Sequence, residues 1–258
     1  SDSRWLGFAL EGYVFAAFMF WIFCFSMSRY SQYLERLSPN EGLSQSYVTK
    51  IVQDPKGFLW IATQMGLNRY DGYQLKQIAG PSDIFEKELI DTLYVDRQGF
   101  IWVSTLYSGL YRMDPQTLKS ELMFSGKVDP AAEFSDVVTA IIQQNQNEFI
   151  LAIKDGVYRL NTATGQITNL LLLNSNDLYV RDILLVGQNL FAASSGGLYQ
   201  VNLVSGHQAI IPHRPAGIST PDSNNTKLLI RDEELGLLVG TVEGLYQLTM
   251  SKDFQTPI

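Results

Sequence analysis

The stretch GLSQSYVTKIVQDPKGFLWIATQMGLNRYDGYQLKQI, Gly42–Ile78, decides the fold. It holds three short runs, VTKIVQ, FLWIAT and GLNRY, whose length and apolar content are typical of β-strands. Asp54 and Gly57 stand between the first two runs, where the carboxylate can cap a tight turn and the glycine supplies a positive φ. Gly66 opens the third run at a second turn. The stretch therefore predicts four antiparallel strands, the last from Tyr73 to Ile78.

The same phrases return along the chain. The third run recurs in steps of 43, 47, 41 and 47 residues, as GLNRYD, GLYRMD, GVYRLN, GLYQVN and GLYQLT, starting at Gly66, Gly109, Gly156, Gly197 and Gly244. The second run recurs as WIAT, WVST, ILAI, FAAS and LVGT, starting at Trp60, Trp102, Ile150, Phe191 and Leu238. A period in the forties with three β-patterned phrases predicts propeller blades. The predicted fold is all-β, a β-propeller with five four-stranded blades at residues 42–80, 86–124, 134–172, 178–212 and 224–258.

Trp60 and Trp102 admit two interpretations, as aromatic platforms for a ligand or as packing between blades. Their place in the repeat is taken by Ile150, Phe191 and Leu238, so we interpret the position as a packing site. Five blades that do not close edge to edge leave exposed sheets, and the sequence predicts an incomplete or strained ring.

Composition excludes some classes of function. A net charge of −7 and a pI near 4.9 give no positive field, so we expect no nucleic-acid partner. The single cysteine, Cys24, cannot form a disulfide or a thiolate metal site within one chain. The two histidines, His207 and His213, lack the spacing of metal ligands. We therefore expect no metal and no cofactor.

The N-terminal segment Trp5 to Met27 is apolar apart from Glu11. As a helix it would reach about 35 Å, enough to cross a bilayer core of about 30 Å. Ser26 and Ser28 also form a pattern that a signal peptidase can accept, so a retained anchor and a cleaved signal peptide both stay open. The predicted organisation is an anchor or signal at residues 1–30, a linker at 31–41 and the propeller at 42–258.

Gly42–Ile78 resembles the two-component regulator propeller repeats of the periplasmic sensor regions of bacterial hybrid histidine kinases and diguanylate cyclases. The resemblance continues through Asp96 to Asp114 and weakens in the last three blades, which lack the tryptophan and the Asp-x-x-Gly turn. It implies seven-bladed rings, a location at the bacterial inner membrane with the propeller in the periplasm, and a cytoplasmic output module. It also implies a small-molecule or oligosaccharide ligand and self-association of the receptor.

No catalytic residue is predicted. Ser195-Gly196-Gly197 is the repeat turn and no nucleophile elbow, and the acidic run Asp232 to Glu234 occupies a hairpin tip.

A polar column emerges when the first strands are aligned by repeat. Because the first strand of a blade lines the central channel, these residues are predicted to face it. A channel is also wet without any ligand, and that interpretation stays open. The column consists of Thr49, Asp91, Thr139, Arg181 and Lys227.

Other candidates lie at the ends of the blades, where variable loops on a rigid scaffold often carry recognition. The loops are residues 79–88, 124–134 and 212–225. The hairpin tips offer Tyr107, Lys154, Asp155 and Glu243 as ligand-binding residues.

The function predicted from the sequence is that of an extracytoplasmic sensory propeller, attached to the membrane through the N-terminal helix and without an enzyme activity of its own. Two alternatives stay open. A propeller enzyme, such as a lyase or a glycosidase, would need converging acid and base groups or a metal in the channel. A purely structural interaction scaffold would need a buried interface above about 1,000 Å².

Overall fold

The computed structural model describes residues 13–24, 37–125, 137–173, 179–211, 225–232 and 236–248. The chain divides into two compact units, residues 1–41 and residues 42–258. The boundary at Gly42 coincides with the start of the first predicted blade.

In the first unit, residues 13–24 are helical and a short 3-10 helix, η1, spans Pro39–Glu41. Large apolar side chains of the helix are exposed, among them Phe15, Phe20 and Trp21. The predicted span from Trp5 to Met27 extends at both ends beyond the described residues. Within the part that is described, no helix has both the length and the apolar character needed to cross a membrane.

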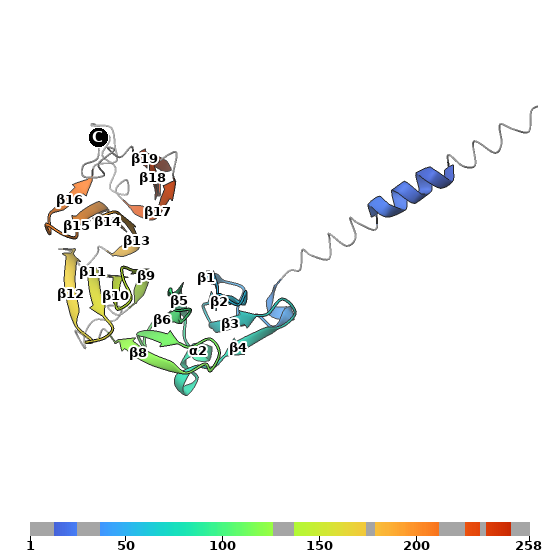
Figure 1. Ribbon diagram of the computed structural model, residues 1–258, viewed down its shortest axis with the longest axis horizontal. Helices are drawn as coiled ribbons and strands as arrows, with labels where there is room; N and C mark the ends of the chain where they lie inside the picture. The colour runs from blue at the N-terminus through green and yellow to red at the C-terminus, as the bar shows by residue number, and fades with distance from the viewer. Residues whose placement is uncertain are drawn as a thin grey trace, which may run out of the picture. The chain divides into compact units, whose positions relative to one another are not determined.

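The second unit is built from five antiparallel sheets that follow one another in chain order (Figure 1). The first sheet contains β1 (Val48–Gln53), β2 (Leu59–Thr63), β3 (Gly66–Tyr70) and β4 (Leu75–Ile78). The second contains β5 (Ile90–Val95), β6 (Ile101–Thr105), β7 (Leu110–Met113) and β8 (Ser120–Phe124). The third contains β9 (Val138–Gln143), β10 (Glu148–Ile153), β11 (Gly156–Asn161) and β12 (Ile167–Leu172). The fourth contains β13 (Val180–Val186), β14 (Asn189–Ser194), β15 (Gly197–Asn202) and β16 (Gln208–Ile211). The fifth contains β17 (Thr226–Asp232), β18 (Gly236–Thr241) and β19 (Leu245–Leu248).

The propeller fold is thus confirmed, with two adjustments. The fifth sheet has three strands among the described residues, and the segment after Leu248 lies outside them. The outer strand of the first sheet begins at Leu75 and not at Tyr73, because Asp71 Oδ1 accepts the N–H groups of Tyr73 at 2.8 Å and Gln74 at 2.7 Å and holds both in the turn.

Each sheet packs on the next through its buried side chains. Trp60 belongs to the cluster between the first and second sheets, and Trp102 to the cluster between the second and third, where its ring lies 4.3 Å from that of Phe149. Ile150 and Phe191 occupy the corresponding clusters farther along. The packing interpretation is confirmed for these four residues, whereas Leu238 of the fifth sheet is half-buried and lies outside the core clusters. Apolar side chains stay exposed on both end sheets, such as Ile51 at 55% and Leu228 at 50%.

A carboxylate and an indole hold the first hairpin in two of the sheets. Asp54 Oδ1 accepts the N–H groups of Lys56 and Phe58, and Oδ2 accepts the indole N–H of Trp60 at 2.9 Å. Asp96 repeats the arrangement with Gln98, Phe100 and Trp102. The predicted turn cap is therefore present, and it continues into the core through the tryptophan.

Residues 79–88, predicted as a variable loop, contain the 3-10 helix η2 (Pro81–Asp83) and the short helix α2 (Ile84–Lys87). Phe85 of α2 is fully buried and lies edge to face on Tyr111, with ring centroids 5.4 Å apart. Its backbone passes so close to Gly66 that a Cβ there would meet the Phe85 carbonyl oxygen at 2.6 Å. Glycine at position 66 is thus needed for space as well as for its positive φ.

Candidate functional site

A cavity of about 360 Å³ lies between the innermost strands of the first four sheets. We call it the central pocket. Apolar and polar side chains share its wall, and the charged or polar groups come from separate sheets. Its lining consists of Lys50, Val52, Gln53, Thr92, Leu93, Tyr94, Val95, Ala140, Ile141, Asp182 and Ile183.

The polar column predicted to face the channel lies one residue before this lining. In every sheet the register between the first two strands shifts by one residue, as between Val48 and Lys50. Each predicted residue is therefore the extra residue of a β-bulge, where the alternation of side chains between the two faces of the sheet is interrupted. The five bulge residues are Thr49, Asp91, Thr139, Arg181 and Lys227.

Two of the bulge residues join neighbouring sheets. Thr49 Oγ1 donates to the carbonyl of Ile90 at 2.6 Å, and Thr139 Oγ1 donates to the carbonyl of Val180 at 2.9 Å. In both cases the acceptor is the first residue of the inner strand in the next sheet. These hydroxyls therefore hold consecutive inner strands together.

The other bulge residues differ from one another. Asp91 is half-buried, and its burial raises the pKa of the carboxyl. Arg181 stacks on Tyr179, with 4.2 Å between the guanidinium carbon and the ring centroid, and donates to the Tyr179 hydroxyl. Burial lowers the pKa of Arg181, and Lys227 is exposed.

Asp182 is the acidic group of the central pocket. Its Oδ2 accepts the N–H of Leu229 at 2.8 Å and Oδ1 accepts the N–H of Ile183 at 3.0 Å, so it joins the fourth sheet to the fifth. Burial raises the pKa of Asp182, while the two N–H groups and the positive charge of Lys50 act in the opposite direction. Lys50 and Asp182 therefore interact electrostatically across the pocket.

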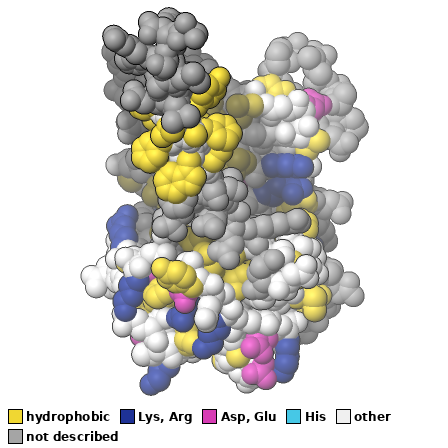
Figure 2. Space-filling model, turned by 90° about the vertical axis from the view of Figure 1, so that its right-hand side faces the viewer, with side chains coloured by type: hydrophobic (Ala, Val, Ile, Leu, Met, Phe, Trp, Pro, Cys, Tyr) yellow, Lys and Arg dark blue, Asp and Glu magenta, His cyan; other side chains and the backbone are white. Residues whose placement is uncertain are grey.

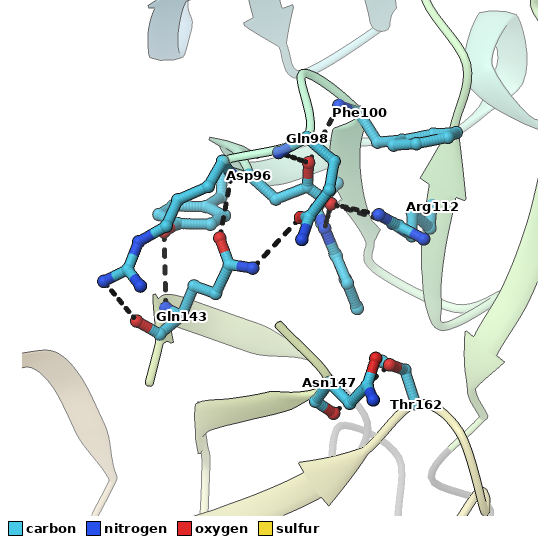
Figure 3. A network of polar contacts seen from close by, with 10 residues as sticks. Asp96, Gln98, Phe100, Arg112, Gln143, Asn147 and Thr162 are labelled. Atoms are coloured by element: carbon cyan, nitrogen blue, oxygen red, sulfur yellow. Dashed lines mark hydrogen bonds and ion pairs between the residues drawn. The ribbon is translucent and has the colours of Figure 1, made fainter. Parts of the chain in front are cut away.

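A hydrogen-bond network joins the second and third sheets beside the pocket residue Tyr94 (Figure 3). Gln143 Oε1 accepts the N–H of Arg97 at 2.8 Å, its Nε2 donates to Gln98 Oε1 at 3.0 Å, and its backbone N–H donates to the Tyr94 hydroxyl at 3.3 Å. Because the Tyr94 hydroxyl oxygen accepts this hydrogen bond, the hydroxyl can still donate its proton to another group. The network fixes a hydroxyl at the pocket wall.

The hairpin tips predicted as binding residues do not line the central pocket. Tyr107 is 60% exposed, and its N–H donates to Glu88 Oε2. Lys154 is half-buried, and the neighbouring Asp155 accepts the hydroxyl proton of Tyr158 at 3.0 Å. Burial, with the charge of Asp155, raises the pKa of Tyr158 to about 12. Glu243 is exposed at the β18–β19 hairpin.

Of the other predicted features, the loops at 124–134 and 212–225 lie largely outside the described residues, as does His213, while His207 is exposed. In the ranges that the structure does describe, no three His, Cys, Asp or Glu side chains come together as a metal site would require. On the face drawn in Figure 2, Lys and Arg side chains are scattered among uncharged ones and form no continuous basic field.

Comparison with known proteins gives short sequence matches and a broad structural one. Residues 42–65 match the family model described as two component regulator propeller. Over 35 residues the chain is 74% identical to the inner membrane amino-acid ABC transporter permease protein YhdY of Escherichia coli (strain K12), which covers 14% of this chain and 10% of the permease. Over 39 residues it is 51% identical to histidine kinase P4 of Formosa agariphila, covering 15% of this chain and 3% of the kinase.

Among solved structures, the extracellular domain of the hybrid two component system BT3049 from B. thetaiotaomicron is similar with a TM-score of 0.69 and 24% identity. The similarity covers 87% of this chain and 31% of that one, so this chain spans less than a third of each protein compared here. At this identity the similarity shows the fold. Residues 42–65, which hold β1 and β2, thus match the two component regulator propeller model, and the five sheets have a propeller fold similar to that of this extracellular domain.

Proposed function

We propose that this chain is the sensory part of a membrane-attached bacterial receptor, and that it binds a small polar molecule in the central pocket. The observation that carries the proposal is the convergence of Lys50, Thr92 and Asp182, from three different sheets, on one cavity of about 360 Å³. Polar groups that converge from separate elements on one cavity, beside apolar side chains, are a usual feature of small-molecule sites.

The receptor role is supported by the regulator-propeller repeat at residues 42–65 and by the fold shared with an extracellular sensor domain. The match to a histidine kinase supports an output by phosphorylation from a module elsewhere in the receptor. The propeller would then lie in the periplasm, with the first unit at the inner membrane.

Membrane attachment is supported by the apolar helix at residues 13–24. A match of 35 residues to an inner membrane permease is consistent with a membrane segment in the chain. Under this proposal, residues 1–41 supply the anchor and the propeller supplies the binding site.

The proposal is tested by filling the pocket in a way that blocks a ligand of any charge. Ala140 lines the pocket, so Ala140→Phe should obstruct it, while Ala163→Phe adds the same ring at an exposed turn outside it. The full chain, purified in detergent, is screened by thermal unfolding against sugars, amino acids and organic acids. Retained secondary structure in both variants is verified by circular dichroism.

We expect at least one compound to raise the unfolding midpoint of the wild type and of Ala163→Phe but not of Ala140→Phe. A screen without any stabilising compound, or a stabilisation that survives Ala140→Phe, would contradict the proposal. Recovery of a bound compound in chemically altered form would favour the enzyme alternative.

A further inference from the structure

We infer that the ligand of the central pocket is a small zwitterion, a free amino acid or a short peptide, whose carboxylate meets Lys50 and whose ammonium group meets Asp182. This inference rests on the proposed function, since it names the chemical class that the same pocket would select.

The first argument is the separation of the two charges. Lys50 lies close enough to act on the carboxyl of Asp182, yet neither residue takes part in an ion pair within 4.0 Å among the described residues. Two opposite charges that share a cavity without touching leave room for a molecule that carries the complementary pair. Such a molecule would form two charge-assisted hydrogen bonds, the stronger class of hydrogen bond in proteins.

The second argument is the cost of the charges. A carboxylate that is partly removed from water pays a desolvation penalty, which burial at Asp182 expresses in its raised pKa. A neutral ligand would deepen that penalty without an opposite charge to offset it. A ligand ammonium group would offset the penalty at Asp182, a ligand carboxylate would pair with the exposed Lys50, and a zwitterion supplies both groups.

The third argument is size and surface. About 360 Å³ is at the lower end of the roughly 300–1,000 Å³ typical of small-molecule sites, which suits one or two amino-acid residues better than an oligosaccharide. Val52, Leu93 and Ile141 supply an apolar wall for a side chain. The Tyr94 hydroxyl proton is available as a further donor to the ligand carboxylate.

A ligand held in this way would connect β1 with β13, the inner strands of the first and fourth sheets, which are not neighbours in the sheet order. Binding would therefore add a direct link across the pocket between two strands that belong to sheets that are not consecutive. That link is a means by which occupancy could alter the stiffness of the propeller.

The test measures affinities of the full chain for the twenty L-amino acids and dialanine, with glucose and maltose as neutral probes, by calorimetry. Any amino acid that binds is compared with its amide, which lacks the carboxylate, and with its deaminated acid, which lacks the ammonium group. Lys50→Gln is the principal variant because Lys50 is exposed and makes no hydrogen bond that the fold needs among the described residues. Lys76→Gln, on the outer strand β4, is the matched control.

We expect an amino acid or dialanine to bind the wild type and Lys76→Gln equally, and each single-charge analogue to bind about tenfold or more weakly. Lys50→Gln should weaken the zwitterion about tenfold and leave the affinity for the amide nearly unchanged. Asp182→Asn should weaken the zwitterion and spare the deaminated acid, and its unfolding midpoint shows whether the bond to Leu229 is kept.

The outcomes separate the two proposals. Suppose that glucose or maltose binds tightly, that Ala140→Phe abolishes this binding and that Lys50→Gln leaves it unchanged. That result would overturn the inference of a zwitterionic ligand and would keep the proposal of a sensory pocket. Binding of amino acids that is indifferent to Lys50→Gln would also overturn it. Absence of binding by every probe would overturn both.

Discussion

The indole N–H of Trp102 donates to Oδ2 of Asp96 over 3.0 Å, and both side chains are fully buried. The same oxygen receives Nη2 of Arg112 at 2.7 Å and Nε at 2.8 Å. The Asp96 carboxylate thus caps the hairpin turn, binds the buried indole and forms an ion pair. The Arg112 guanidinium carbon also lies 3.9 Å from the centroid of the Phe100 ring.

Removing the negative charge of Asp96 should lower the stability of the fold. Asp96→Asn leaves Arg112 without its counter-ion in a largely buried place, and we expect the free energy of unfolding to fall by about 3 kcal/mol. Asp83→Asn, which breaks the exposed pair with Lys87, should cost well under about 1 kcal/mol. Urea titration of both variants measures the difference, and equal losses would show that the buried pair contributes little.

The repeat glycine is expected to be needed for space. At Gly156 a Cβ would clash with the Leu171 carbonyl oxygen, so Gly156→Ala should destabilise by about 3 kcal/mol. Gly165 has a φ of +71° and open space around it, so Gly165→Ala should cost only the left-handed backbone, about 1 kcal/mol. Unfolding midpoints in urea compare the two, and a larger loss at Gly165 would contradict the steric explanation.

The bulge hydroxyls should contribute to cohesion between sheets. Thr49→Val keeps the shape but removes the donor to the Ile90 carbonyl, so we expect a loss of about 1 kcal/mol. Thr49→Ser keeps the hydroxyl and should retain most of the stability. If valine and serine behave alike in chemical denaturation, the hydrogen bond has no net effect.

Stability should respond to pH through Asp91. Burial raises its pKa in the folded chain, so the ionised carboxylate destabilises the fold above that pKa and has no effect below the ordinary value of 3.8. Asp91→Asn should therefore raise the unfolding midpoint near about pH 7 and lose this gain near about pH 3.

Asp71 provides the opposite case for that measurement. The N–H of Gln74, then that of Tyr73, lowers its pKa, so its stabilisation is present at neutral pH and is lost as the pH falls through the lowered pKa. Asp71→Asn should lower the midpoint near about pH 7, with an effect that shrinks in acid. The same sign for both variants would disprove the assignment.

The propeller could be predicted because its local signals repeat. Turn carboxylates, hairpin glycines and a large apolar residue in the second strand each have a local physical cause, and five copies fix their spacing. The bond from Asp54 to Trp60 was missed, although the spacing D-x-x-G-x-x-W occurs twice in the sequence and was the available signal.

The polar column stays a prediction as a binding site. Its residues lie at bulges, which the alignment of repeats does not reveal, and the cavity is lined instead by the polar residues that follow three of them, Lys50, Thr92 and Asp182. Phe85 was assigned to a loop, since four helical residues are too few to show a period. Lys50 and Asp182 line one cavity, and Phe85 packs on Tyr111, although the members of each pair are far apart in the sequence. Only the folded chain reveals such relationships.

The buried indoles have a spectroscopic consequence. The chain has four tryptophans, of which Trp5 and Trp21 belong to the first unit and Trp60 and Trp102 to the first two sheets. The third, fourth and fifth sheets contain no tryptophan, but Trp102 packs on Phe149 of the third. A fluorescence melting curve would therefore follow the first two sheets and their contact with the third, and would miss a separate transition in the fourth and fifth.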